Sequence, residues 1–297
     1  MPHNEDIFKK ISAFTAAEGL IWGICDASAP DGLDELLARA DTPFVPKDRT
    51  LRTDPRRTMP GAKSIVVAGL GVKKRPAFVT DGEPRGIIAA GFIGPDYHAE
   101  LRGRLTRLAS FLPAETQIQV DNGPLAERAF AHRAGLGFYG KNGCLISRAF
   151  GSFFHIGLLL CDMPLPAAVS EDPASRCGSC RLCIDACPTG ALTGGTPAVN
   201  PRACLSAVTQ KKGPLTEREA QNLNGRLFGC DICQHVCPYN EEVPTASPDE
   251  RNAYYPKLSD ILTMTAADFD VRFGNTAAAW RGKGVLQRNA RALADAQ

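Results

Sequence analysis

Residues 177–188 read C-G-S-C-R-L-C-I-D-A-C-P, and this stretch decides how the second half of the chain folds. Three cysteines at two-residue intervals, then a fourth after three residues and a proline, form a bacterial [4Fe-4S] run, whose fourth thiolate ligates the other of two clusters. A second run, C-D-I-C-Q-H-V-C-P at residues 230–238, has the same ending, and one more cysteine stands at position 204. The pattern predicts a module that holds two cubanes.

The eight cysteines form two complete ligand sets when the runs are paired crosswise. Soft thiolates suit iron, and a tight C-x-x-C-x-x-C loop can wrap three corners of a cubane while a distant segment supplies the fourth. Zinc in two four-thiolate sites is the alternative, but zinc has no use for a third closely spaced cysteine. A disulfide framework is disfavoured by the chain length and the absence of a secretory signal. The predicted sets are Cys177, Cys180, Cys183 and Cys237, and Cys187, Cys204, Cys230 and Cys233.

Composition indicates a soluble globular protein. Of 297 residues, 44% are hydrophobic and 22% charged, and no window approaches eighteen uninterrupted apolar positions, so we expect no membrane span. Eleven cysteines point to the reducing cytoplasm, and the three outside the ligand sets, Cys25, Cys144 and Cys161, are interpreted as small buried hydrophobes. With a net charge of +2, a nucleic acid would have to bind a local basic patch. We expect a monomer.

The first half of the chain alternates short apolar runs with helical periodicity. Residues 43–62, rich in proline and basic side chains, are expected to form a loop, as are residues 73–95. We expect helices at residues 5–18, 33–40 and 96–112 and from Pro124, and strands at residues 20–25, 63–70, 118–121 and 153–161.

Asp121 ends one of these strands, in the text V-D-N-G-P. It has two interpretations: an N-cap of the following helix, or a catalytic group at the end of a strand, where ligands sit in α/β folds. The glycine-rich G-L-G-F-Y-G-K-N at residues 135–142 is not a phosphate loop, because its helix precedes it; its small residues would let the backbone approach a flat or bulky ligand. His155 is interpreted as a core histidine.

The second half begins at residues 164–173, where the chain is rich in proline and apolar residues no longer recur at a regular spacing. A short helix at residues 201–210 should present Cys204, and further helices are expected at residues 258–273 and 280–296. These observations predict three domains: residues 1–165, residues 166–245 with the clusters, and a helical tail at residues 246–297.

The chain resembles the tRNA epoxyqueuosine reductases. The matching text includes R-T-D-P-R-R-T-M-P-G-A at residues 52–62, D-Y-H at 96–98, V-D-N-G-P-L-A-E-R at 120–128, A-G-L-G-F-Y-G-K-N at 134–142 and both cysteine runs. The resemblance implies an α+β or α/β fold in which base-off cobalamin is held between a nitroreductase-related N-terminal domain and a ferredoxin-like module with two [4Fe-4S] clusters. It implies reduction of epoxyqueuosine to queuosine at the tRNA wobble position, with electrons from a low-potential donor.

The resemblance also implies roles for single residues. Asp121 would bind at the cobalamin and donate a proton, for which we expect a buried side chain, and Arg52 would bind the cobalamin. Ser206, Thr209 and Lys211 fall in a segment that lies near cofactor and tRNA in the family. We further attribute RNA binding to basic side chains late in the chain, namely Lys211, Lys212, Arg281, Lys283, Arg288 and Arg291.

Three departures from the family pattern stand out. Residues 89–92 read A-A-G-F where the family has an arginine and an aromatic, Leu158 replaces a common glutamate, and the usual C-terminal repeat extension is missing. Two other functions therefore stay open: a cobalamin and iron–sulfur reductase acting on a small molecule, and an electron-carrying ferredoxin fused to a non-catalytic domain.

Overall fold

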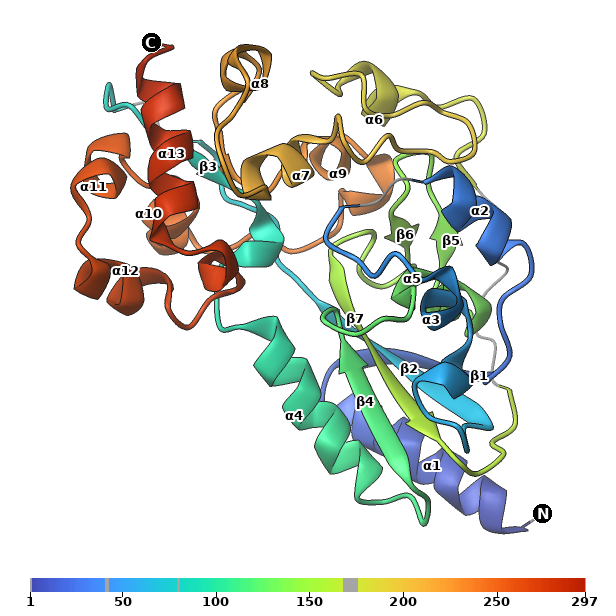
Figure 1. Cartoon of the computed structure of the whole chain (residues 1–297). Coiled ribbons are helices and arrows are strands. Elements are labelled where there is room, and N and C mark those ends of the chain that lie inside the picture. Colours follow the sequence, from blue (N-terminus) through green and yellow to red (C-terminus); the bar gives the residue numbers. More distant parts are fainter. Residues whose placement is uncertain (1, 41–42, 79–80, 168–175, 297) are drawn as a thin grey trace. The chain divides into compact units, whose positions relative to one another are not determined.

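The chain divides into two compact units in the computed structural model, which describes residues 2–40, 43–78, 81–167 and 176–296 (Figure 1). The first unit comprises Met1–Gly71 and His98–Cys180, and the second comprises Val72–Tyr97 and Arg181–Gln297. Residues 72–97 thus belong with the cysteine-rich half, although residues 98–180 of the first unit separate the two segments in the sequence. The expected domain boundary at residues 164–173 lies mostly outside the described residues. None of the described helices is long and apolar enough to cross a membrane.

The first unit is built on one four-stranded sheet. Its strand order is β1-β2-β7-β4, and every neighbouring pair is antiparallel. The strands are rich in aliphatic residues, and β2 is buried along most of its length, as predicted for a strand covered on both faces. An antiparallel sheet makes this unit α+β rather than α/β. The strands are β1 (Leu20–Asp26), β2 (Ser64–Gly71), β4 (Thr116–Val120) and β7 (Phe154–Cys161).

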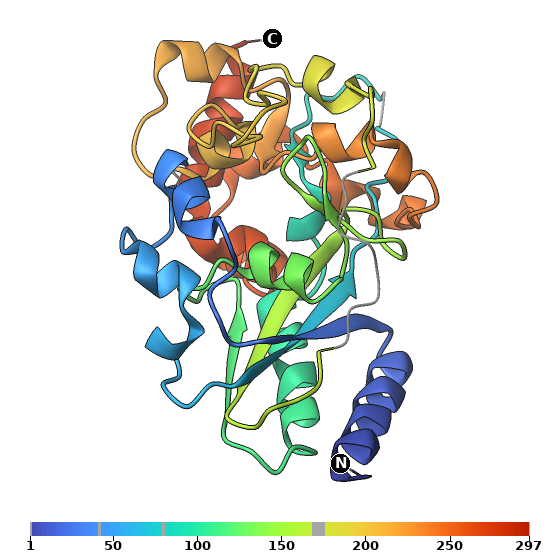
Figure 2. The same ribbon diagram turned by 90° about the vertical axis from the view of Figure 1, so that its right-hand side faces the viewer.

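Helices cover both faces of this sheet (Figure 2). On one face, α1 (Pro2–Ala17) stacks Phe8 on Trp22 of β1 at 5.0 Å between ring centroids. On the same face, α4 (Tyr97–Ala109) packs so closely on β7 that a Cβ at Gly157 would lie 2.6 Å from Leu105. On the other face, α5 (Glu127–Arg133) contributes Phe130 to a core cluster with residues of β1, β2 and β7.

The remaining elements of the first unit are short. The expected loop at residues 43–62 contains two helical turns, α3 (Arg49–Thr53) and η1 (Pro55–Arg57), because Asp48 and Asp54 cap them with their side chains. The glycine-rich segment at residues 135–142 leads into a small hairpin of β5 (Phe138–Tyr139) and β6 (Leu145–Ile146), which the sequence did not predict. Helix α2 (Leu33–Arg39) was predicted within one residue.

The second unit is a set of short helices around a parallel pair of strands, β3 (Ile87–Ile88) and β8 (Arg226–Phe228). The predicted helix at residues 258–273 is broken, because Thr265 and Asp268 form a capping box that starts a new helix. The helices are η2 (Ala90–Phe92), α6 (Leu182–Asp185), α7 (Leu205–Gln210), α8 (Glu217–Gln221), α9 (Ile232–His235), η3 (Pro238–Asn240), η4 (Pro248–Glu250), α10 (Arg251–Tyr254), α11 (Leu258–Thr263), α12 (Ala266–Phe273), η5 (Ala277–Arg281) and α13 (Lys283–Ala294).

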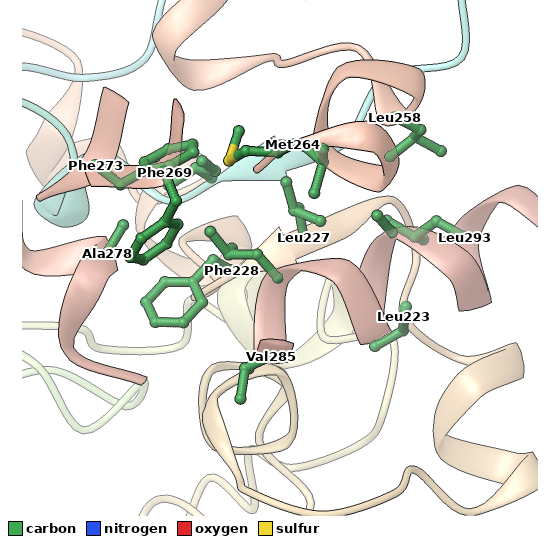
Figure 3. Close-up of a cluster of buried hydrophobic side chains, with 14 of the residues drawn as sticks. Leu223, Leu227, Phe228, Leu258, Met264, Phe269, Phe273, Ala278, Val285 and Leu293 are labelled. Carbon is green, nitrogen blue, oxygen red and sulfur yellow. The ribbon is translucent and has the colours of Figure 1, made fainter. Parts of the chain in front are cut away.

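One hydrophobic core joins the cysteine-bearing segment to the C-terminal helices (Figure 3). Leu227 and Phe228 of β8 pack with Leu286 of α13 and Phe273 of α12, and all four side chains are at most 2% exposed. Residues 258–293 are therefore part of the core of the second unit. The segment predicted as a helical tail, residues 246–297, thus contributes side chains to the same core as the cysteine-bearing segment.

Candidate functional site

Asp121 stands at the apex of a tight turn directly after β4. The backbone N–H of Asn122 donates to the carbonyl of Val120 at 2.6 Å, and Asp121 between them has φ 55°, a left-handed conformation that is uncommon for a residue other than glycine. Its carboxylate Oδ2 lies 3.1 Å from Nε2 of His98, on α4. Such strained residues persist only where surrounding contacts fix them, and they cluster at functional sites.

Two further side chains hold this turn. Glu127, the first residue of α5, accepts the backbone N–H of Asp121 through Oε1 at 2.6 Å. The buried Gln119 donates to the same Oε1 at 3.1 Å and to the carbonyl of Leu125 at 3.0 Å, and it accepts the N–H of Leu125 at 3.0 Å. Neither residue carries a signal in the sequence that marks it as functional, although both lie within or beside the motif that contains Asp121.

Three expectations about Asp121 change with these observations. The N-cap interpretation is wrong, since α5 begins at Glu127 and its N-cap is Ala126. The sheet is antiparallel, so Asp121 does not lie at the carboxyl edge of a parallel α/β sheet, where ligands bind. The side chain is also 59% exposed rather than buried. A bound ligand would therefore have to supply the apolar cover that keeps the acid protonated.

Arg52 lies beside the same loop. Its carbonyl accepts the N–H of Ala126 at 2.9 Å, while its Nε atom is buried and has no hydrogen-bond partner. Burial and the neighbouring Arg128 lower the pKa of Arg52. Arg128 in turn donates to the carbonyl of Gly143, and the adjacent Asn142, 4% exposed, has an unpartnered Nδ2. This part of the first unit thus gathers positive charge and spare donors, which suit a ligand that presents carbonyl or phosphate oxygens.

The contacts of Lys141 give the G-K-N motif at residues 140–142 a structural role that the sequence did not reveal. Its ammonium group donates to the carbonyl of Gly178 at 2.6 Å and to that of Cys180 at 3.0 Å. Both acceptors lie in the first C-x-x-C loop, so Lys141 orders the loop that carries Cys177 and Cys180. The segment therefore supports the first cysteine run.

The two cysteine runs have the same local fold. Helices α6 and α9 are each four residues long, follow an N-cap residue of nearly equal φ (−129° and −131°), and pack against each other. Each carries a middle cysteine of its run, Cys183 or Cys233. The crosswise pairing of the two runs stays a prediction from their spacing. No three His, Cys, Asp or Glu side chains among the described residues converge on a single metal ion.

Cys204 is the N-cap of α7, which begins four residues later than the helix predicted at residues 201–210, and it lies near Cys230. Burial raises the pKa of the Cys230 thiol to about 11, and the charge of Cys204 contributes to the rise. Two thiolates that disfavour each other in this way are stabilised by a shared cation or cluster. The proximity is consistent with Cys204 and Cys230 in one ligand set. Cys25 and Cys161 are buried as expected, whereas Cys144 is partly exposed.

A buried ion pair supports the second cysteine run. Asp231, directly after Cys230, accepts hydrogen bonds from both Nε and Nη2 of Arg75, at distances down to 2.8 Å and 2.9 Å. Asp231 also accepts the N–H of Ala90 at 3.0 Å. Burial opposes the charge of Asp231, but His235 and Arg75 outweigh it and lower the pKa of the carboxyl far below its usual range. The segment at residues 89–92, which differs from the family pattern, is thereby hydrogen-bonded to the second cysteine run.

The other expected binding residues have internal partners. Thr209 is fully buried; its hydroxyl donates to the carbonyl of Leu205 at 2.9 Å and accepts the N–H of Gly229 at 2.9 Å, which leaves no surface for a cofactor. Ser206 accepts the side-chain amide of Gln210 at 3.0 Å and stays partly exposed. Leu158 is buried in the core beneath α5, opposite Gln119 in the ladder.

The expected RNA-binding set is mostly engaged in the fold. Lys211 pairs with Glu219 at 2.7 Å, and Arg288 donates to the carbonyls of Lys211 and Gly213, each at 2.6 Å. Arg281 stacks on the ring of Trp280, and Lys283 donates to the carbonyl of Met264 at 3.2 Å. For Lys211 and Arg288 the attribution to RNA is not supported, because their charges already have acceptors within the second unit. Lys212 and Arg291 are exposed.

Comparison with known proteins covers nearly the whole chain. Residues 52–123 match the family model of epoxyqueuosine reductase QueG, DUF1730, and residues 176–240 match the 4Fe-4S double cluster binding domain. The epoxyqueuosine reductase of Staphylococcus aureus is 38% identical over 260 residues, which cover 83% of this chain and 67% of that protein. The chain belongs to the epoxyqueuosine reductase family. Residues 176–240 of this chain therefore form an iron–sulfur domain.

Solved structures of this family agree with the fold. An epoxyqueuosine reductase with an epoxyqueuosine-modified tRNA-Tyr stem loop has a TM-score of 0.91 and 32% identity, over 99% of this chain and 82% of that one. The Bacillus subtilis epoxyqueuosine reductase has a TM-score of 0.90 and 31% identity, over the same shares of the two chains. In that Bacillus subtilis structure an aspartate-bearing catalytic loop is swung out of the active site. This member of the epoxyqueuosine reductase family thus spans about four fifths of the length of these two solved relatives.

Proposed function

We propose that this protein reduces epoxyqueuosine to queuosine in tRNA, with Asp121 as the proton donor. Family membership supports the reaction, and one relative was solved with an epoxyqueuosine-modified tRNA stem loop. The observation in this chain that carries the proposal is the strained turn that presents the Asp121 carboxylate beside His98. The Bacillus subtilis relative has a catalytic loop that bears an aspartate, and we infer that the turn of Asp121 is its counterpart.

The stoichiometry of the reaction shows why it needs a positioned acid. Two C–O bonds of the epoxide break and a C=C bond forms, two electrons and two protons enter, and the oxygen leaves as water. An alkoxide is a poor leaving group, so protonation of the departing oxygen lowers the barrier. Asp121 is exposed in the free chain, so it can reach a substrate atom, and His98 is placed to return a proton to it afterwards.

The residues around Asp121 fit a cobalamin. The buried, unpartnered Nε of Arg52 and Nδ2 of Asn142 are two donors without acceptors, and the amide and phosphate oxygens of a corrinoid would satisfy them. Bound there, cobalamin would supply a cobalt ion that exchanges electrons one at a time with iron–sulfur clusters. Arg52 would hold it by hydrogen bonds and charge, and Ser206 remains a predicted contact. Thr209 acts through the fold, since its side chain has no exposed surface.

The eight cysteines would hold two [4Fe-4S] clusters in the crosswise sets. The match to a double-cluster domain supports two clusters, and the cysteine spacing supports the crosswise sets. The clusters would pass single electrons from a low-potential donor to the reaction site. An electron carrier without catalysis is disfavoured, because it would have no use for the strained turn at Asp121.

One experiment tests the function directly. Protein reconstituted with iron, sulfide and cobalamin under anaerobic conditions is given tRNA that carries epoxyqueuosine and a low-potential reductant, and nucleosides are quantified after digestion. We expect loss of epoxyqueuosine and an equal gain of queuosine. Unchanged epoxyqueuosine in the presence of protein that carries both clusters and cobalamin would refute the proposal and favour a small-molecule substrate.

A further inference from the structure

The turn that presents Asp121 holds a residue other than glycine in a left-handed conformation, so contacts from neighbouring residues have to support it. Asp121 has positive φ, and the loop packs so tightly that a Cβ at Gly123 would lie 2.0 Å from the side chain of Gln119. A conformation of this kind relaxes when the contacts that enforce it are lost. The contacts in question are few and come from residues that flank the loop.

Glu127 and Gln119 close the loop from both ends. Gln119, on β4, binds both backbone groups of Leu125, and its remaining donor goes to Oε1 of Glu127. The same Oε1 accepts the N–H of Asp121, at 2.6 Å. Across the ladder from Gln119 stands the apolar Leu158, which offers the Gln119 amide no alternative partner. The hydrogen-bonding capacity of Gln119 is thus directed entirely at the loop.

We propose that Glu127 is a positioning residue, which together with Gln119 clamps the loop at residues 121–126 and thereby holds Asp121 toward the substrate. The inference rests on the proposed role of Asp121 as the acid. Glu127 acts on the backbone of Asp121, whereas His98 contacts its side chain, so the two supports are separate. Loss of the clamp would release the Asp121 turn without removing the acid itself.

The protonation of Glu127 bears on the strength of this clamp. Burial, followed by the charge of Asp121, raises the pKa of Glu127 to about 8, while hydrogen bonds from Gln119 and Asp121 and the charge of His98 oppose the rise. A charged carboxylate accepts N–H groups more strongly than a neutral acid does. The clamp should therefore tighten as the pH rises through about 8. Mutual repulsion between Glu127 and Asp121 also favours a proton on one of the two.

A double-mutant cycle tests the inference. Single-turnover rates are measured for reconstituted wild type, Glu127→Ala, Asp121→Asn and the double variant, with Glu115→Ala as a control at an exposed glutamate ahead of β4. We expect Glu127→Ala to lower the rate about tenfold or more in the presence of Asp121, and less than about twofold in Asp121→Asn, because Glu127 acts only through Asp121. The KM for tRNA should not change.

A second readout keeps the test independent of turnover. Hydrogen exchange of the peptide that spans residues 119–127 should be faster in Glu127→Ala, near normal in Glu127→Gln, whose amide oxygen still accepts the N–H of Asp121, and unchanged in Glu115→Ala. After correction for intrinsic exchange, protection should increase with pH through about 8 in wild type and stay level in Glu127→Gln.

The results that would overturn the inference are distinct from those that overturn the function. Equal losses from Glu127→Ala with and without Asp121, or unaltered exchange of the loop, would show that Glu127 does not position the acid. An Asp121→Asn enzyme as active as wild type would instead overturn the role of Asp121, and this inference with it.

Discussion

Replacement of Arg75 by methionine should destabilise the second unit strongly. The Arg75 and Asp231 side chains are 9% and 1% exposed, and the guanidinium makes a bidentate contact with the carboxylate. Removal of one partner of a buried pair leaves an uncompensated charge and costs about 3–5 kcal/mol. The N–H of Ala90 and the ring of His235 would remain beside Asp231, and they offset only part of this cost.

The size of the effect can be read from thermal unfolding. For a unit of this length, a loss of 3–5 kcal/mol corresponds to a fall of roughly 10–15 °C in the unfolding midpoint. Lys257→Met is the matched control, because Lys257 pairs with Glu83 at 3.4 Å and both side chains are at least one third exposed. Such a pair contributes about 0.5 kcal/mol.

The assay compares anaerobic unfolding scans of the three proteins at one scan rate, with iron content measured in parallel. Arg75→Met should also lose iron, since Asp231 follows Cys230 directly. The folded-state pKa of Asp231 is lowered, so its stabilising contribution is present above the unfolded pKa of about 4 and is lost as the pH falls below it. An Arg75→Met midpoint within 2 °C or so of the control would refute the reasoning about buried charge.

Three further outcomes are expected. Cys204→Ala should lower the iron content from about eight to about four per chain, because Cys204 ligates one cubane only, and an unchanged count would contradict the crosswise sets. Lys141→Met should make one cluster more sensitive to chelators than the other, since it frees the loop of Cys180, and equal loss of both clusters would contradict this. Lys211→Ala should leave the salt dependence of tRNA binding unaltered, because Lys211 is paired with Glu219. Lys212→Ala should lower the slope of that salt dependence by roughly one unit if Lys212 contacts a phosphate. The reverse result would show that the ion pair of Lys211 and Glu219 opens on tRNA binding.

The sequence predicted the elements that depend on local pattern. The strand at residues 63–70 and the helix at residues 33–40 are bounded by signals within a few residues of their ends, and the structure confirms them. The short helices at residues 49–57 were missed because their only signals are the caps Asp48 and Asp54, inside a segment with prolines and no period.

The functional site was predicted only in part, because only some of its residues stand in a local sequence pattern. Asp121 and the cysteines stand in recognisable text, but the partners that fix them come from other elements. Asp231 pairs with Arg75, which is 156 positions away in the sequence, and Lys141 binds the carbonyl of Cys180, which is 39 positions away. Pairings of this kind depend on how the chain packs, which neither spacing nor periodicity encodes. Glu127 was within reach of sequence analysis as an acid six residues after Asp121, but its role depends on the strained turn.

The role of Asp121 as acid is tested most directly by single-turnover conversion of epoxyqueuosine in tRNA by Asp121→Asn. Asparagine keeps the size of the side chain and can contact His98, but it has no proton of suitable acidity to donate. We expect the variant to hold both clusters and to bind cobalamin as wild type does, and to convert its substrate more slowly by roughly a hundredfold or more. Conversion at a near-normal rate by a fully loaded Asp121→Asn enzyme would contradict the account.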